Sequence, residues 1–292
     1  MTTSAEPARL PPDLTLGPVR LQVGDLSRSL AYYEGVLGLG VLERAAGSAV
    51  LGPSGERVPL VELRERPGSL PVPRRGRLGL YHFAVLLPDR ASLGRFVTHL
   101  AAAGVRIGAS DHRVSEALYL TDPDGLGIEV YADRPRSAWE WEAGELVMST
   151  DPLDLDSVAA AAGGRPWTGM PPGTRIGHLH LHVGTLGQAS AFYQDALGFE
   201  PTVRSYPGAL FLSAGGYHHH LGLNTWAGDA AVPAGDGEAR LLEWTVAAGP
   251  ADMERAAARV AQAGYSVSEA APGWLLTDPW GTRLRLVTSS TP

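Results

Sequence analysis

Apolar and polar residues follow one pattern that recurs four times along the chain. Each copy opens with alternating apolar and polar positions, typical of a half-buried strand, and continues through a polar turn into an amphipathic helix. A glycine closes each helix at the position expected for a left-handed C-cap, and short β-like runs separated by Gly, Pro or Asp turns follow. The copies begin near Val19, His82, His178 and Leu242. The repeated unit is therefore β-α-β-β-β, and function is expected where the copies differ.

We expect four such modules to be arranged along the chain as two pairs. An α+β fold is predicted, with the following ranges: a flexible tail, 1–16; an N-terminal domain, 17–134, with modules 17–66 and 78–134; a linker, 135–173; and a C-terminal domain, 174–289, with modules 174–226 and 238–289. The linker fits no copy of the repeat. Its DPLDLDSVAAAAGG stretch predicts a short helix, and its tryptophans are expected to pack on a domain surface.

Composition narrows the chemistry that is open to this protein. The 292 residues include no cysteine, which excludes disulfides, thiolate catalysis and zinc–thiolate sites. The net charge of −7 without a basic block argues against nucleic acid or an anionic membrane as a partner. No apolar run approaches membrane-spanning length, and the first residues do not resemble a secretory signal, so a cytoplasmic protein is expected. Any metal must be held by histidine and carboxylate.

Three such residues occupy framework positions in the middle copies only. His82 and His178 open the first strands of copies two and three at the same point, where copy one has Pro18. Glu129 lies in the last strand of copy two, where copy four has Arg285. Two imidazoles and one carboxylate with open positions on one side are the set preferred by non-haem Fe(II). The alternative for His82 alone is a hydrogen-bonded core histidine.

Other polar and aromatic residues lie near these three in the sequence. His112 and Tyr119 precede Glu129, and Tyr119 could equally be ordinary strand packing. His180 shares a strand face with His178, and such a face is too polar for ordinary core. Trp226 could line a pocket for an aromatic ring.

Three consecutive histidines end copy three, in GGYHHHLGLN: His218, His219 and His220. They form either an exposed patch or part of the cleft, and neutral histidines there could take a proton from a phenol and return it. The sequence alone does not indicate which of the three points inward.

The βαβββ repeat resembles the vicinal oxygen chelate superfamily, as do GHLHLHV, AFYQDALGF and DHRVSEALYLTDPDGLGIEVYADRP. Within this superfamily the chain is most similar to type I extradiol ring-cleavage dioxygenases of the catechol 2,3-dioxygenase-like branch. The resemblance covers nearly all of the chain except the tail and the linker. It implies two glyoxalase-like domains with curved mixed sheets around a cleft.

The resemblance also implies roles for individual residues. His82, His178 and Glu129 would hold Fe(II), with Mn(II) as an alternative, and the substrates would be a catechol- or hydroquinone-type aromatic and O2. His219 would be the acid–base residue, with His218 or His220 as alternatives, and Tyr119 and His112 would assist it. The expected substrate-binding residues are His180, His218, His220 and Trp226.

One departure from the family pattern makes a structural prediction. The better-known extradiol enzymes build the site from copies three and four, whereas the matching residues here lie in copies two and three. These copies should therefore face one another, within one chain or across a homodimer, while copies one and four serve as scaffold. The rival functions are a glyoxalase-like isomerase or thiol-transfer resistance enzyme, and a metal-free protein that binds an aromatic drug.

Overall fold

A computed structural model describes residues 9–289 of the chain. Within these residues the strands form two nine-stranded mixed sheets and one small hairpin. The first sheet has the order β18 (Ser266–Glu269), β19 (Trp274–Thr277), β20 (Arg283–Thr288), β17 (Arg240–Ala248), β2 (Val19–Val23), β5 (Val61–Glu65), β4 (Ser48–Gly52) and β3 (Gly40–Ala45). A short strand β1 (Thr15–Leu16) also pairs with β17. This sheet therefore joins modules one and four.

The second sheet joins modules two and three. Its order is β13 (Glu200–Val203), β14 (Ala209–Ser213), β15 (Leu221–Asn224), β12 (Arg175–His182), β6 (Arg77–Leu86), β9 (Gly127–Asp133), β8 (Ser115–Thr121) and β7 (Gly108–Asp111), with β16 (Val232–Pro233) paired to β6. The prediction that modules two and three face one another is confirmed, and they meet within one chain through the β6–β12 pair.

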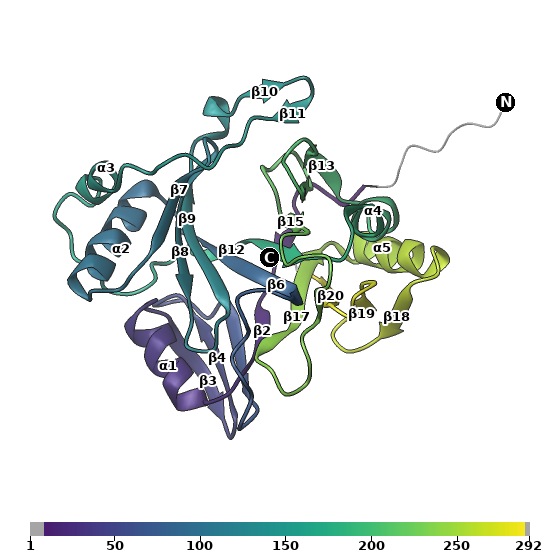
Figure 1. The fold of residues 1–292 in the computed structure, drawn as a ribbon, viewed down its shortest axis with the longest axis horizontal. Coiled ribbons are helices and arrows are strands. Elements are labelled where there is room, and N and C mark those ends of the chain that lie inside the picture. The colour runs from purple at the N-terminus through teal and green to yellow at the C-terminus, as the bar shows by residue number, and fades with distance from the viewer. Residues whose placement is uncertain (1–8, 290–292) are drawn as a thin grey trace.

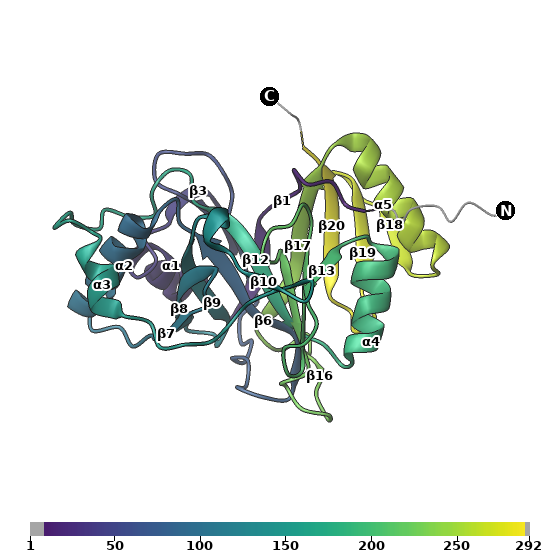
Figure 2. The same cartoon turned by 90° about the horizontal axis from the view of Figure 1, so that it is seen from above.

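The helices lie on the outside of the two sheets in two groups, one from each half of the chain (Figures 1 and 2). They are α1 (Leu26–Gly35), α2 (Arg90–Ala102) and α3 (Leu155–Ala160) on one side, and α4 (Leu186–Ala189), its π-helical continuation η2 (Ser190–Ala196) and α5 (Pro250–Gln262) on the other. Each sheet crosses from one side to the other. The boundaries of the two expected domains stay a prediction, because both sheets contain strands from both halves.

The helix boundaries agree with local signals in the sequence. Asp25 and Thr185 cap α1 and α4, because their side chains accept from the backbone N–H groups of Arg28 and Gln188. The glycines that end the four long helices have positive φ angles, as left-handed C-caps require. They are Gly38, Gly104, Gly198 and Gly264. None of the helices in the described residues is long and apolar enough to cross a membrane.

Two of the sequence predictions need correction or extension. The expected tail, 1–16, is wrong for its second part, because Leu10 and Leu14 are buried and β1 joins the first sheet; residues 1–8 lie outside the described residues. The linker contains the predicted short helix as α3, and also a 3-10 turn η1 (Arg136–Ala138) and the hairpin of β10 (Trp141–Glu142) with β11 (Glu145–Leu146). Apolar burial of Leu10 and Leu14 explains why the segment is held in place.

The two modules of each half dock through one repeated interaction. The Tyr33 hydroxyl of α1 donates to the buried Asp122 carboxylate, 3.1 Å away, in the turn between β8 and β9. The Tyr193 hydroxyl of η2 donates in the same way to Asp278, at 2.9 Å. Both carboxylates also accept backbone N–H groups of their own turns, so neither is left without partners inside the protein.

Modules one and four carry an ion-pair network where modules two and three carry the predicted ligands. Arg285 donates twice to the buried Glu243, at 2.6 and 3.0 Å. Arg20 lies 3.5 Å from Glu243 and donates to Glu62 at 2.7 Å. Arg285 and Glu62 thus each have a charged partner within the first sheet. Charges that are paired in this way suit a scaffold role for modules one and four.

The Tyr33 interaction predicts a pH-dependent loss of stability. Burial raises the pKa of Asp122 from 3.8 to about 6, so the folded protein favours the protonated carboxyl. The stability that this carboxyl contributes is therefore complete below about pH 4 and is lost as the pH rises through about 6. Tyr33→Phe removes a donor to the ionised form, and we expect a loss of about 1–3 kcal/mol at about pH 8 and a smaller one at about pH 4.5. Urea unfolding at both pH values measures this, with Tyr32→Phe as the control. Equal losses at the two pH values would contradict it.

The ion-pair network predicts a second effect on stability. Arg285→Met replaces the apolar stem of the arginine but removes its charge, so Glu243 stays buried without its main partner. We expect a loss of about 3 kcal/mol in the free energy of unfolding. Adding Glu243→Gln should restore part of that loss, because the unpaired charge is gone. Arg283→Met, at a half-exposed side chain 4.0 Å from Glu243, is the control and should change stability by less than about 1 kcal/mol. An unchanged unfolding curve for Arg285→Met would refute the prediction.

Candidate metal centre

Three adjacent strands of the second sheet bring the predicted ligands together. His178 lies on β12, His82 on the neighbouring β6 and Glu129 on β9, which pairs with β6 on its other side. The Glu129 Oε2 atom lies 3.0 Å from His82 Nε2 and 3.2 Å from His178 Nε2. One candidate ligand atom of each residue lies within 4.8 Å of the others, and all three side chains are buried. These residues are far apart in the sequence, and the pairing of the strands brings them together.

The three side chains fit a divalent cation. Metal–ligand bonds of about 2.1 Å at right angles separate neighbouring donor atoms by about 3 Å, which is the spacing found around Glu129. The His82 Nε2 atom is buried and makes no hydrogen bond, although it is close to the carboxylate, because the geometry is unsuitable. A buried nitrogen without a partner is expected at a site built for another group.

The charge states of the cluster also suit metal binding. Burial lowers the pKa of His178 to about 4, so its ring is neutral near pH 7 and a nitrogen lone pair is available. Burial opposes ionisation of Glu129, but the neighbouring His178 and His82 rings hold the pKa of this carboxyl well below its usual range. The cluster therefore offers two imidazoles and one carboxylate, a set used by non-haem Fe(II) and accepted by other divalent ions.

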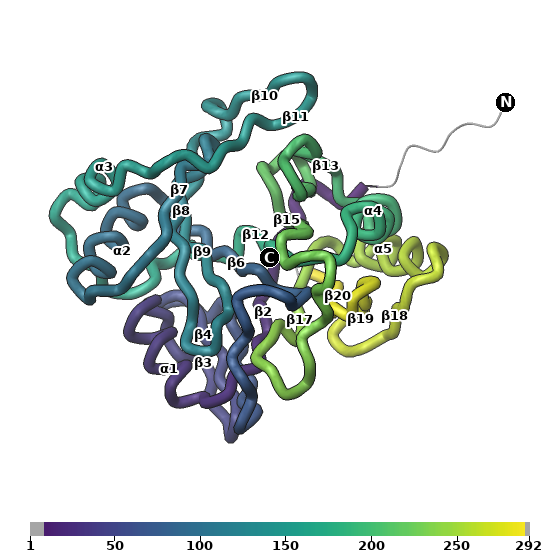
Figure 3. The backbone as a smooth tube through the Cα atoms, viewed as in Figure 1, coloured from purple at the N-terminus to yellow at the C-terminus, as the bar shows by residue number. Residues whose placement is uncertain are grey.

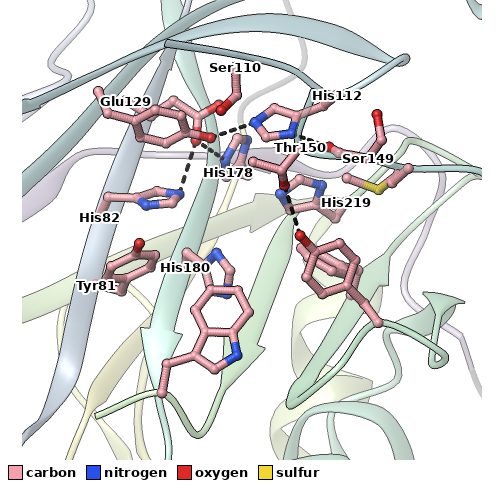
Figure 4. A pocket seen from close by; sticks show the side chains of 15 residues that line it. Tyr81, His82, Ser110, His112, Glu129, Ser149, Thr150, His178, His180 and His219 are labelled. Atoms are coloured by element: carbon pink, nitrogen blue, oxygen red, sulfur yellow. Dashed lines mark hydrogen bonds and ion pairs between the residues drawn. The ribbon is translucent and has the colours of Figure 1, made fainter. Parts of the chain in front are cut away.

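The cluster forms one wall of a cavity of about 310 Å³ (Figure 4). This volume is within the range of pockets that hold small organic ligands. The lining residues come from modules two and three and from the linker: Tyr81, His82, Ser110, His112, Tyr119, Glu129, Met148, Ser149, Thr150, His178, His180, Tyr206, Phe211, His219 and Trp226.

His112 and Tyr119 form a hydrogen-bonded pair at the cavity wall. The Tyr119 hydroxyl lies 2.6 Å from His112 Nε2, and His112 Nδ1 lies 2.6 Å from the carbonyl oxygen of Ser149. Because a carbonyl only accepts, the Nδ1 atom carries the proton, and Nε2 accepts from the Tyr119 hydroxyl. Burial raises the pKa of Tyr119 well above its ordinary value, so the phenol stays protonated and remains a donor.

The structure separates the three consecutive histidines. His219 lines the cavity, and its ring packs on that of His178 with centroids 4.1 Å apart. His218 is fully buried behind it, and its Nε2 atom lies 3.0 Å from Asp133 Oδ1. His220 accepts the backbone N–H of Ala214 through Nδ1. His218 and His220 are not among the residues that line the cavity, and the substrate-binding role expected for them stays a prediction.

The other expected substrate-binding residues do line the cavity. His180 lies between His82 and Trp226, with ring centroids 5.1 and 5.4 Å away, and Tyr81 packs edge-on against it. Its Nε2 atom is buried without a hydrogen-bond partner. The ring fits closely over Gly222, where a Cβ atom would come within 3.0 Å of it. Trp226 is partly exposed and stands at this aromatic side of the cavity.

The linker contributes to the cavity in a way that sequence reasoning missed. The hairpin of β10 and β11 and the segment after it pass over the gap between β7 and β13 (Figure 3). Met148, Ser149 and Thr150 line the cavity from this side, and Thr150 shares a hydrogen bond with Tyr206 at 2.8 Å. A segment without a counterpart in any repeat carried no pattern that could have placed it there.

Comparisons with known proteins agree with this architecture. The profile described as Glyoxalase/Bleomycin resistance protein/Dioxygenase superfamily matches residues 15–130 and 175–285. A Bacillus subtilis (strain 168) protein named catechol-2,3-dioxygenase is 46% identical over 271 residues, which cover 91% of this chain and 94% of that protein.

Solved structures support the fold alone, because their sequence identity is low. A protein of Bacillus subtilis subsp. subtilis strain 168 superposes with a TM-score of 0.65 at 13% identity, covering 97% of this chain and 87% of that one. Glyoxalase I from Zea mays superposes with a TM-score of 0.55 at 17% identity, covering 94% and 92%. The repeat, the shared sheets and the profile match together show that the chain belongs to the Glyoxalase/Bleomycin resistance protein/Dioxygenase superfamily.

Proposed function

We propose that this protein is an Fe(II)-dependent extradiol dioxygenase that inserts O2 into the ring of a catechol- or hydroquinone-type aromatic. The observation that carries the proposal is the convergence of His82, His178 and Glu129 at the wall of a cavity that also holds His219 and Tyr119. Mn(II) is the alternative metal, since the donor set accepts it as well.

The reaction class has independent support. The relative that is 46% identical over 91% of the chain is a catechol-2,3-dioxygenase, and cleavage beside the two hydroxyls of a catechol is the extradiol reaction. This identity supports assignment of the chain as an extradiol ring-cleavage dioxygenase. The choice of iron and the particular aromatic substrate belong to the proposal.

The residues of the chain divide the work by position. His82, His178 and Glu129 would hold the divalent metal, which when bound supplies Lewis-acid and redox chemistry toward an aromatic hydroxyl and O2. Burial lowers the pKa of His219 well below its ordinary value, so its ring is neutral and can accept a proton from a substrate hydroxyl. The Tyr119 hydroxyl donates its proton to His112, so its oxygen can accept a hydrogen bond from a hydroxyl of the ligand.

The rest of the cavity supports an aromatic substrate. Phe211, Tyr206 and Trp226 give it an apolar side, and Met148 adds a flexible contact from the linker. A planar ring could pack on these residues while its hydroxyls face the three ligands. A cytoplasmic location and a homodimer stay predictions.

The first test concerns the metal. Glu129→Gln keeps the shape of the side chain but removes a carboxylate, and His178→Ala removes an imidazole; each should reduce bound Fe(II) from near one ion per chain to a small fraction. Anaerobic reconstitution followed by metal analysis and calorimetric titration measures this. His99→Gln is the matched control, since His99 lies on α2 and contacts the Val36 carbonyl. Full metal binding by either site variant would count against shared ligation.

The second test concerns the reaction. With Fe(II) bound, the protein should consume O2 with a member of a small panel of catechols and hydroquinones, and His219→Gln should lower kcat by about 10²- to 10⁴-fold without loss of metal. Oxygen uptake and the absorbance of the ring-cleaved product give the rates, again with His99→Gln as the control. Turnover of methylglyoxal hemithioacetal, without oxygen uptake on any diphenol, would instead favour a glyoxalase-like isomerase.

A further inference from the structure

A buried chain of hydrogen bonds runs from Asp133 to the cavity. The His218 Nε2 atom lies 3.0 Å from Asp133 Oδ1, and the His218 Nδ1 atom lies 2.7 Å from Nδ1 of His219. His218 is 0% exposed and His219 is 6% exposed, whereas the Asp133 side chain is partly open to solvent. The function proposed above gives no role to His218 or to Asp133.

With the imidazole rings of His218 and His219 both neutral, this series of hydrogen bonds allows one placement of its protons. The Asp133 carboxylate accepts hydrogen bonds and does not donate them, so the proton between it and His218 lies on Nε2. A neutral imidazole has one N–H, which leaves a lone pair on His218 Nδ1. The facing Nδ1 of His219, at 2.7 Å, must then be the donor. The Nε2 atom of His219 therefore keeps its lone pair and is the nitrogen left for the cavity.

The surroundings hold this arrangement in place. The Tyr217 hydroxyl also donates to Asp133 Oδ1, at 3.2 Å, and Tyr131 is hydrogen-bonded to Tyr217 at 2.7 Å. The Tyr217 ring packs on His218 with centroids 4.0 Å apart. Trp139 of the linker covers His218 with centroids 5.5 Å apart. With the ring packed on two sides and Asp133 held by a second donor, His218 has little freedom to rotate.

We infer that His218 and Asp133 are positioning residues that hold His219 in one tautomer, with a proton on Nδ1 and a lone pair on Nε2 toward the cavity. This inference rests on the proposed function for its consequence in catalysis: a base that must accept a proton from a substrate hydroxyl needs that lone pair. A carboxylate that selects the tautomer of a catalytic imidazole is an established device in other enzymes, where losing it lowers kcat strongly.

Two substitutions of His218 separate positioning from simple packing. His218→Asn places an amide oxygen where Nδ1 stood, so it can still accept the proton of His219 Nδ1. His218→Leu fills the space but accepts nothing. We expect kcat for the diphenol substrate to fall by about 100-fold in His218→Leu, with KM, bound Fe(II) and the melting temperature changed little, and to recover to within about threefold of the parent in His218→Asn.

The tautomer itself can be observed without any turnover. In metal-free protein labelled with ¹⁵N-histidine, long-range ¹H–¹⁵N spectra distinguish a protonated from an unprotonated ring nitrogen, and the signals missing in His219→Gln identify His219. We expect an unprotonated Nε2 in the parent and in His218→Asn, and a proton on Nε2 in His218→Leu.

The outcomes decide the two proposals separately. A proton on Nε2 of His219 in the parent, or an unchanged kcat in His218→Leu, would overturn the positioning role. If no diphenol is turned over by the parent, the dioxygenase proposal fails, and the ¹⁵N spectra alone still decide the tautomer. If His218→Leu does not fold, the parent spectrum and the kcat of His218→Asn provide the test, and a 100-fold loss in that variant would count against positioning.

Discussion

The candidate centre depends on the antiparallel pairing of β6 with β12. In that register His180 lies opposite His82 and His178 lies opposite Ala84, and the parallel partner of Ala84 on β9 is Glu129. The three ligands therefore come from three adjacent strands of one sheet. Because side chains alternate across a strand, a shift of one residue between β6 and β12 would turn one histidine to the other face. The irregularities in that pairing, beside His178 and His180, lie where the histidines are placed.

The corresponding positions of the first sheet hold charged residues that pair with one another. Its β2–β17 pair corresponds to β12–β6, and Arg285 on β20 takes the position that Glu129 has on β9. Buried polar groups at these positions need partners in either sheet. Arg285 and Glu243 satisfy one another within the chain, whereas His82 keeps a nitrogen without a hydrogen bond. The repeated fold thus holds one closed, self-satisfied set of charges and one set left open to a ligand.

Features with a local or periodic signal were predictable from the sequence. The repeat, the caps such as Asp25, and the equivalence of His82 with His178 follow from patterns that span one module. Features set by contacts between distant segments were not. The burial of Leu10, the cover formed by Met148, and the choice of His219 over its neighbours depend on what packs against them from elsewhere in the chain. Three adjacent histidines carry no sign of which one faces a cavity that two modules and the linker form together.

The two histidines beside the ligands share one principle of construction. One nitrogen of His112 is held by the Ser149 carbonyl, and one nitrogen of His219 is held by His218. In both cases the group that holds one ring nitrogen decides which nitrogen keeps the lone pair. The Ser149 contact comes from the linker, and Trp139 of the same linker packs on His218. A segment outside the repeat therefore contacts the groups that orient both rings, and this explains how a fold built from four similar modules can present two oriented histidines on only one of its sheets.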